Sequence, residues 1–335
     1  MKNILLLLSI VICSCGSKSS NEILVSNYGF TQGTTYNISY RSPNAQSYQV
    51  GIDSVLHTVD LSMSTYIDSS TISKINRNEL YEKDGLFLRV LETALQIAEE
   101  TNGAFDPTIA PMVNYWGFGF KEISEKNEAK LVELSKTVGY KKVSVLNGSV
   151  VKENPSIQLD FNAIAQGFTV DLVSEYLQKH GIVNYMIEIG GEVKCKGLNA
   201  DDKLWRIGVD KPSETIQENR FQAILELNNQ SIASSGNYRK FKIDQVTGKK
   251  YAHTINPITG KPVQTNLLAV SLVTESCMHA DAYATAFMVM GLEASKNFLK
   301  NRNDIEALFI YTDPKENWQV YQTKGFEDIT VYSSN

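Results

Sequence analysis

The stretch MHADAYATAFMVMG, residues 278–291, decides the fold, because it is a helix-like run set among segments that alternate like strands. Most of its residues are alanine, methionine or other apolar types, so a helix here is expected to be buried. Asp281 and Thr285 interrupt this apolar character, and their spacing places a carboxylate and a hydroxyl on one helix face. The stretch predicts a buried helix that carries a polar site.

Strand signals surround this helix on both sides. Alternating or β-rich segments occur at residues 185–189, 205–209, 221–227, 238–243, 268–273, 305–311 and 318–321. Hairpin-like strands mixed with separated helices favour an α+β fold over a parallel doubly wound sheet. We therefore predict mixed, largely antiparallel sheets with flanking helices.

The N-terminal half contributes most of the predicted helices. Apolar residues at helical spacing predict helices at 50–59, 86–101 and 124–138. A strand is expected at 34–40, and another at 156–160 that runs into a helix from about residue 163 to 180. Asn147-Gly148 predicts a hairpin between two short strands within 142–151. Because no linker divides the chain, residues 22–335 are predicted to form one domain.

Composition and charge restrict the class of protein. The 335 residues are 42% hydrophobic and 21% charged, which is typical of a globular protein. The formal net charge is −5, and no cluster of lysine and arginine interleaves with aromatic residues. Both observations argue against a nucleic-acid partner.

The first 21 residues read as a targeting segment. One lysine precedes an apolar run that is too short to span a bilayer, so residues 1–14 are predicted to be a signal peptide. Residues 12–15, Ile-Cys-Ser-Cys, match the bacterial lipobox, in which the last cysteine is acylated. Cys15 is then the lipid anchor, and residues 15–21 form the lipidated cysteine and its tether.

This interpretation predicts a protein of the bacterial cell envelope, lipid-anchored to the inner membrane and facing the periplasm. The alternative is a plain secretory peptide with two unused cysteines. Beyond the leader only Cys195 and Cys277 remain, without a zinc-binding spacing. They either pair as a disulfide or, as we favour, pack separately as small apolar residues.

Asp281 has two interpretations from pattern alone. A buried carboxylate is costly unless it is paired or bound to a metal, and hard oxygen ligands such as Asp281 and Thr285 suit Mg²⁺. The alternative is that Asp281 caps its own helix. The sequence leaves both open.

Three further stretches place polar or aromatic side chains at turns. In IQLDFNAIAQG, Asp160 is expected at a strand end before the small residues of a helix start, where a cap is the alternative. TNGAFDPTIAPMVNYWGFG, residues 101–119, combines turns with aromatics that suit a flat ring or a packed core corner. YAHTINPITGKPV, residues 251–263, holds His253 beside a two-proline turn, which is either a catalytic loop or an ordinary strand end.

Taken together and in order, these motifs resemble the FAD:protein FMN transferases of the ApbE family, from about Gly33 to the C-terminus. The matching pieces are QGTTY (32–36), MSTYIDSSTISKIN (63–76), GAFDPTIAPMVNYWGFG (103–119), LDFNAIAQGFTVD (159–171), EIGGEV (188–193), SIASSGNYRKF (231–241), HTINPITGKPV (253–263) and ADAYATAFMVMG (280–291). The resemblance implies an ApbE-like fold with an FAD site in a central cleft, and residues 22–335 as the FMN transferase domain.

The resemblance also implies roles for single residues. Asp281 and Thr285 match the side chains that bind Mg²⁺, and Ala163 matches a main-chain ligand. FAD contacts map to Gln32, Tyr66, Ala104, Phe105, Asp106, Asp160, Gln166 and Ile255. His253 matches the histidine to which the catalytic role is usually assigned, and Asp160 or Asp106 could share it. Gln32, Gln166 and Asn256 depart from the family's usual residues, which puts individual FAD contacts in question.

The implied reaction transfers the FMN half of FAD to a threonine hydroxyl of another protein and releases AMP. Mg²⁺ is the implied cofactor and FAD the substrate. The implied partners are exported, threonine-bearing domains of membrane electron-transport complexes of the NQR or Rnf type. Two alternatives remain open: an FAD pyrophosphatase that yields FMN and AMP, and a non-catalytic flavin-binding lipoprotein.

Overall fold

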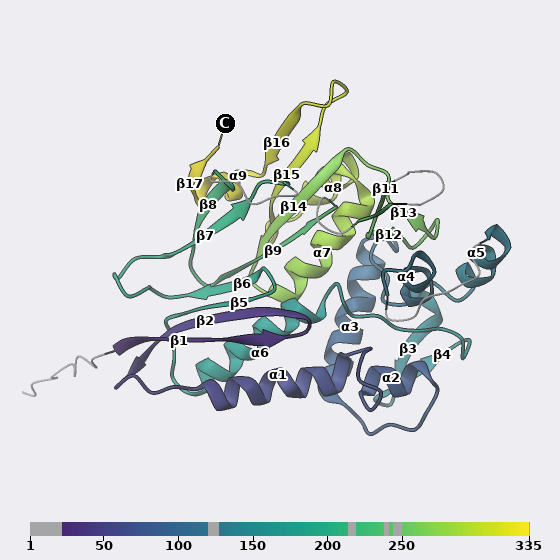
Figure 1. The fold of residues 1–335 in the computed structure, drawn as a ribbon, viewed down its shortest axis with the longest axis horizontal. Helices are drawn as coiled ribbons and strands as arrows, with labels where there is room; N and C mark the ends of the chain where they lie inside the picture. The colour runs from purple at the N-terminus through teal and green to yellow at the C-terminus, as the bar shows by residue number, and fades with distance from the viewer. Residues whose placement is uncertain (1–21, 120–126, 214–218, 238–240, 244–249, 335) are drawn as a thin grey trace, which may run out of the picture.

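The computed structural model describes residues 22–119, 127–213, 219–237, 241–243 and 250–334 (Figure 1). An eight-stranded sheet with the order β1-β2-β5-β6-β9-β14-β15-β16 forms its centre, and each neighbouring pair is antiparallel. Its strands are β1 Glu22–Thr31, β2 Thr34–Pro43, β5 Tyr185–Ile189, β6 Glu192–Lys196, β9 Gln230–Gly236, β14 Leu267–Thr274, β15 Glu306–Thr312 and β16 Trp318–Gln322.

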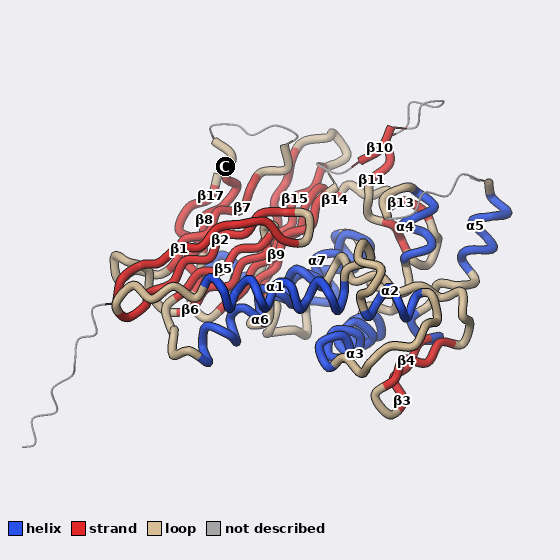
Figure 2. The backbone as a smooth tube through the Cα atoms, turned by 60° about the horizontal axis from the view of Figure 1, so that its bottom comes forward, coloured by secondary structure: helices blue, strands red, loops and turns tan. Residues whose placement is uncertain are grey.

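Helices lie on one face of this sheet (Figure 2). They are α1 Gln49–Met63, α3 Gly85–Glu100, α6 Ala165–Lys179 and α7 Cys277–Met290. Helices α6 and α7 pack directly against strands, and α3 packs on α1 and α7. Ile187 of β5 packs with Ile52 of α1 and Val173 of α6, while Phe309 of β15 packs with Phe287 of α7. The sheet alternates with period two, so the intervening residues point to the opposite face.

A smaller antiparallel sheet covers part of that opposite face. It has the order β17-β8-β7, with the strands β17 Thr330–Ser333, β8 Phe221–Leu227 and β7 Trp205–Asp210. Leu225 of β8 packs there with Leu308 and Ile310 of β15. The predicted α+β fold with largely antiparallel sheets and flanking helices is therefore confirmed.

The remaining elements lie at the ends of these layers. They are α2 Thr71–Asn76, α4 Ala110–Trp116, α5 Glu128–Ser135, the 3₁₀ helix Tyr140–Lys142, β3 Val143–Leu146, β4 Ser149–Lys152, β10 Phe241–Ile243, β11 Lys250–Ala252, β12 Ile255–Asn256, β13 Lys261–Pro262, α8 Leu292–Leu299 and α9 Lys324–Asp328.

Several predicted elements can be compared with the structure directly. The hairpin at Asn147-Gly148 is confirmed, with φ values of 51° and 73° that fit a tight turn between β3 and β4. The predicted helix at 124–138 and strand at 238–243 are described only in part, because residues 120–126 and 238–240 lie outside the described residues.

The predicted strand at 156–160 is wrong. These residues pair with no neighbouring strand, because the Leu159 N–H donates to Asn76 Oδ1 (2.7 Å) and the Asp160 N–H donates to Pro107 O (2.8 Å). Side-chain and loop acceptors thus take the place of a sheet ladder. The helix that follows begins at Ala165, two residues later than expected.

The two cysteines of the folded region are both buried and free. Cys195 packs between the two sheets and Cys277 packs beside α6, so the favoured prediction of separate packing is confirmed. The predicted signal peptide and tether lie outside the described residues. Within the described residues, no helix combines the length and apolar character that crossing a membrane requires.

Candidate active site

Helix α7 carries the predicted polar pair on a partly exposed face. Asp281 and Thr285 are partly exposed, whereas the residues between them and directly after Thr285 are buried. Ser276 precedes the first turn of the helix, so Asp281 lies in the second turn. The alternative that Asp281 caps its own helix is therefore wrong.

The Asp281 carboxylate faces the start of helix α6 instead. Its Oδ2 accepts a hydrogen bond from the Gly167 N–H at 3.1 Å. Burial raises the pKa of Asp281 to about 7, although the hydrogen bond from Gly167 opposes this shift. Burial thus favours the protonated, neutral form of this carboxyl group.

Gly167 lets the two helices approach closely. A Cβ atom at this position would lie 2.4 Å from Cys277 O and 2.9 Å from Asp281 Cβ. Real side chains do not tolerate such distances, so only glycine fits at this crossing. The Gly167 N–H thereby reaches the carboxylate of the neighbouring helix.

Two hairpin tips meet the same part of α6. Gln32 turns the chain between β1 and β2 with a φ of 49°, and its Nε2 donates to Thr169 Oγ1 at 2.7 Å. Its Oε1 is buried without a hydrogen-bond partner in the described structure. Gly190, at the tip between β5 and β6, is so close to Gln166 that an added Cβ would lie 2.9 Å from Gln166 Nε2. The structure therefore brings Gln32 and Gln166 to the helix start that Asp281 contacts.

The predicted aromatic turn forms a second group. Ala104, Phe105 and Asp106 are all buried, and the Asp160 N–H ties their loop to the segment before α6 through Pro107 O. Asp106 accepts hydrogen bonds from Thr108 and from the Tyr140 N–H, and burial raises its pKa. Asp106 is thus a fully bonded turn residue in this structure.

Asp160 is the more available of these two carboxylates. It is buried, and its bonds come from the Asn162 N–H at 2.7 Å and the Asn162 side chain at 3.2 Å. Burial raises the pKa of Asp160. Ala163, the predicted main-chain ligand, lies partly exposed in the turn between Asp160 and α6.

His253 and Ile255 belong to a third group, which packs on helix α4. Ile255 is buried against Met112, and the His253 ring lies 6.4 Å from the Phe118 ring, centroid to centroid. The Trp116 indole N–H donates to Gly260 O at 2.7 Å and so pins the proline turn. Since α4 directly follows the turn at Asp106, the second and third groups are joined through it.

Tyr66 is the predicted contact that the structure leaves most open. Its side chain is 71% exposed and follows the end of α1. Beside it along the chain, the buried hydroxyls of Ser62 and Thr65 have no hydrogen-bond partner in the described structure. Unmatched polar atoms of this kind point to a missing ligand or water.

The residues present fit a magnesium ion. Among the described residues, no three His, Cys, Asp or Glu side chains gather as metal ligands. Asp281 and Thr285 offer two oxygen ligands on one helix face, and the Ala163 carbonyl is a further oxygen of the kind this ion accepts. Mg²⁺ commonly takes few protein oxygens and completes its octahedron with water and substrate phosphate.

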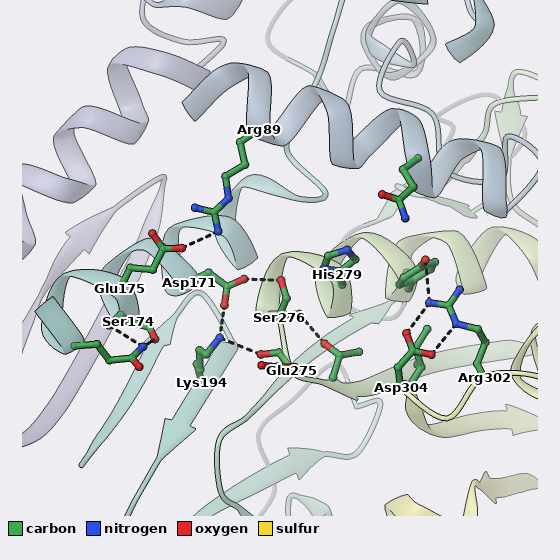
Figure 3. A pocket seen from close by; sticks show the side chains of 15 residues that line it. Arg89, Asp171, Ser174, Glu175, Lys194, Glu275, Ser276, His279, Arg302 and Asp304 are labelled. Atoms are coloured by element: carbon green, nitrogen blue, oxygen red, sulfur yellow. Dashed lines mark hydrogen bonds and ion pairs between the residues drawn. The ribbon is translucent and has the colours of Figure 1, made fainter. Parts of the chain in front are cut away.

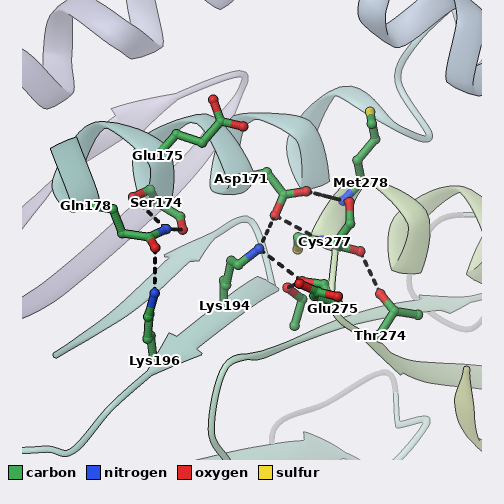
Figure 4. A network of polar contacts seen from close by, with 12 residues as sticks. Asp171, Ser174, Glu175, Gln178, Lys194, Lys196, Thr274, Glu275, Cys277 and Met278 are labelled. Carbon is green, nitrogen blue, oxygen red and sulfur yellow. Dashed lines mark hydrogen bonds and ion pairs between the residues drawn. The ribbon is translucent and has the colours of Figure 1, made fainter. Parts of the chain in front are cut away.

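A charged network about one helical turn from the contact of Asp281 with α6 was not predicted from the sequence. Asp171 of α6 and Lys194 of β6 form a buried ion pair of 2.7 Å, and Asp171 also binds the first turn of α7 (Figure 4). The motif LDFNAIAQGFTVD ends at Asp171. The available signal was a charged residue between Val170 and Leu172, next to the apolar run of this helix.

A cavity of about 430 Å³ opens beside this network (Figure 3). Its walls include Asp171, Lys194, His279, Arg302 and Asp304. None of the site residues predicted from the sequence lines it. The cavity is therefore separate from the candidate active site at the start of α6.

Comparisons with known proteins agree with this geometry. Residues 32–309 match the ApbE family. The chain is 35% identical to the FAD:protein FMN transferase of Vibrio cholerae, with 98% of each chain covered. It is 34% identical to the enzyme of the same name from Haemophilus influenzae, covering 91% of this chain and 90% of that one.

Solved structures show the same similarity. The flavin transferase ApbE from Vibrio cholerae superposes with a TM-score of 0.81 at 34% identity, covering 92% of this chain and 99% of that chain. The ApbE protein from Thermotoga maritima reaches 0.79 at 25% identity, with 92% and 99% covered. The fold and the polar helix pair thus define a flavin-transferase type of protein. The chain belongs to the ApbE family, the family of the FAD:protein FMN transferases, as the sequence motifs predicted.

Proposed function

We propose that this protein is a magnesium-dependent transferase that moves the FMN half of FAD to a threonine hydroxyl of an exported protein and releases AMP. The observation that carries the proposal is the Asp281 carboxylate, which shares a helix face with Thr285 and accepts a hydrogen bond from the Gly167 N–H at the α6 start. The names of the family relatives support the transferase part.

Asp281, Thr285 and the Ala163 carbonyl would hold the ion. When bound there, Mg²⁺ supplies positive charge that stabilises the diphosphate and the charge on the departing phosphate. The protein residues do the positioning: Gly167 keeps the two helices close, so the carboxylate stays next to the α6 N-terminus.

The start of α6 would also receive the substrate's diphosphate. A helix N-terminus presents free N–H groups and a partial positive charge to an anion. Gln166 belongs to the first turn of this helix and Gln32 bonds to Thr169 in the next, and Gln32 Oε1 has no hydrogen-bond partner among the described residues. Phe105, Tyr66 and Ile255 are the apolar contacts proposed for the flavin and adenine rings.

In the transfer step the threonine oxygen attacks the phosphorus of the FMN half. A bond forms between that oxygen and the phosphorus, the bond to the AMP phosphate oxygen breaks, and the threonine proton passes to a base. We assign the base to His253, because histidine can accept a proton near neutral pH. Asp160, whose pKa burial raises, is the second proton acceptor in this proposal.

The decisive experiment incubates the protein with FAD, Mg²⁺ and an acceptor domain from an electron-transport complex of the NQR or Rnf type. Mass spectrometry of the acceptor should show one added FMN on a threonine, and AMP should appear in equal amount. Free FMN with an unmodified acceptor would instead identify a pyrophosphatase, and unchanged FAD would identify a binding protein.

We further propose that Cys15 is acylated and holds the protein on the inner membrane, facing the periplasm. The support is the lipobox at residues 12–15 and the short apolar run before it. Cys15→Ser should move the protein from the membrane to the soluble fraction and abolish labelling with a fatty-acid analogue. Persistent labelling of the variant would contradict the assignment.

A further inference from the structure

We propose that Asp171 and Lys194 are positioning residues that set where the Asp281 carboxylate lies. This inference rests on the proposed function, because it concerns the ion that Asp281 would hold. Among the described residues, neither one is bonded to a predicted FAD or metal contact. The contact of Asp171 with Cys277 lies about one helical turn from the contact of Gly167 with Asp281.

Asp171 binds the first turn of α7 with both carboxylate oxygens. Oδ1 accepts from the Cys277 N–H at 3.1 Å, and Oδ2 accepts from the Met278 N–H at 3.0 Å and from Ser276 Oγ at 2.7 Å. Lys194 Nζ adds a fourth donor at 2.7 Å. The carboxylate of one helix thus caps the N-terminus of the other.

Lys194 extends this anchorage to the strand that leads into α7. Its Nζ also donates to Glu275 O at 3.0 Å, and Ser231 Oγ donates to the same carbonyl at 3.1 Å. Thr274 Oγ1 donates to Ser276 O at 2.6 Å. The entry to α7 is therefore held by β6, β9 and α6 together.

The spacing of the contacts shows how the anchored start of α7 fixes the position of Asp281 along α6. Cys277 meets Asp171, while Asp281 meets Gly167, so the two contacts are four residues apart on each antiparallel helix. Four residues are about one helical turn of 5.4 Å. A shift of the α7 entry along α6 would carry the Asp281 carboxylate away from the Gly167 N–H by the same amount.

The nearby cavity does not account for these residues as ligand groups. Its lysine and arginine side chains are paired within the protein: Arg89 with Glu175 at 2.7 Å, Lys194 with Asp171 at 2.7 Å, and Arg302 with Asp304 at 2.7 Å (Figure 3). Asp171 already accepts four hydrogen bonds. Its chemistry is therefore directed at α7 and not at a bound molecule.

The test compares Asp171→Asn with Glu175→Gln in the full chain. Glu175 is one turn further along α6 and makes an exposed ion pair with Arg89, so its variant is the matched control. The main readout is the dissociation constant of Mn²⁺, a spectroscopic stand-in for Mg²⁺, measured without FAD. Thermal unfolding reports the folded fraction of each variant.

Asp171→Asn should weaken Mn²⁺ binding about tenfold, since outer partners of metal ligands commonly contribute this much. Glu175→Gln should bind Mn²⁺ like the unaltered protein. In Asp171→Asn with Lys194→Met, no buried charge is left unpaired, so stability should recover. Mn²⁺ affinity should nevertheless stay low in this double variant. If Asp171 contributed only to stability, Mn²⁺ affinity would recover together with stability.

Two results would overturn the inference: unchanged Mn²⁺ affinity in folded Asp171→Asn, or affinity that returns in the double variant together with stability. If Asp171→Asn does not fold, Lys194→Gln replaces it and should weaken Mn²⁺ binding by a smaller factor, whereas unchanged affinity would again contradict the proposal. Failure of the proposed function is recognised separately, because Asp281→Ala would then bind Mn²⁺ as well as the unaltered protein.

Discussion

Two contacts between α6 and α7, about one helical turn apart, each place an aspartate of one helix against the first turn of the other. In one contact Asp171 of α6 meets the first turn of α7, and in the other Asp281 of α7 meets the first turn of α6. Asp171 has the Lys194 ammonium at 2.7 Å. Asp281 accepts a hydrogen bond from the Gly167 N–H, without an ion-pair partner in the part of the chain that the structure describes, and burial raises its pKa to about 7.

This difference separates a structural carboxylate from one that is available for chemistry. A buried charge is stable when its partner is part of the chain, and the Asp171–Lys194 pair meets this condition. Asp281 faces a helix N-terminus, but no lysine or arginine side chain among the described residues forms an ion pair with it. An external cation would complete it, which is the role proposed for Mg²⁺.

The largest expected effect comes from removing the available carboxylate. Asp281→Ala should lower the rate of FMN transfer about 1,000-fold, in the upper range for loss of one charge-stabilising group. Steady-state transfer to an acceptor protein at saturating Mg²⁺ measures it. Thr285→Val should lose less, because the carboxylate stays in place. A variant at position 281 with undiminished turnover would refute the metal assignment.

Removing His253 tests whether proton transfer and metal binding depend on different residues. His253→Ala should slow transfer about 100-fold, as loss of a general base commonly does. FAD affinity, followed by flavin fluorescence, and Mn²⁺ affinity should change little. A selective loss of FAD binding would show that His253 holds the substrate instead.

Gly167→Ala should push helices α6 and α7 apart. The added methyl would meet Cys277 O and Asp281 Cβ at 2.4 and 2.9 Å, so we expect a loss of about 1–3 kcal/mol in unfolding free energy. Denaturant unfolding measures this. Gly85→Ala in α3 is the matched control, because nothing lies within 4 Å of its added methyl. Equal stability of both variants would argue against the close crossing.

The pH dependence of metal stabilisation is the smallest effect. With a pKa of about 7, folded Asp281 keeps a proton that the unfolded chain has already lost above its ordinary pKa of 3.8. Its contribution to the metal-free protein's stability is therefore present at low pH and declines as pH rises toward 7. Mg²⁺ competes with this proton.

The rise in melting temperature caused by Mg²⁺ should consequently grow between about pH 6 and pH 8. Differential scanning fluorimetry in matched buffers measures it. Asp281→Asn should show a small rise that does not depend on pH. A rise of constant size in the unaltered protein would mean that Asp281 does not exchange its proton for the ion.

Local patterns predicted the elements whose signal is contained in their own residues. Helix α3 has Val90, Leu91 and Ala94 on its buried face, and the hairpin at Asn147-Gly148 follows from the turn chemistry of that pair. Strands β1, β6 and β9 were missed. Their residues are fixed by pairing in the large sheet, and β1 has apolar and polar side chains on an exposed edge.

The candidate site shows the same division. The sequence named Asp281 and Thr285 as a pair, and it associated the turns of Asp106, Asp160 and His253 with a ligand. It assigned Asp160 to a strand that does not exist, because it could not show that Asn76 and Pro107 take up the hydrogen bonds of that segment. It also offered no partner for Asp171.

The sequence by itself determined the family, the α+β class and the polar face of the helix at residues 277–290, because these depend on residue type and on spacing along the chain. Only the tertiary structure decided that Asp171 is neutralised by a lysine of the chain and that Asp281 is left available for a cation. Lys194 of β6 neutralises Asp171 of α6, whereas Asp281 of α7 meets the Gly167 N–H of α6. In both cases the partner belongs to another element, so the contact forms only when the sheet and the helices pack together.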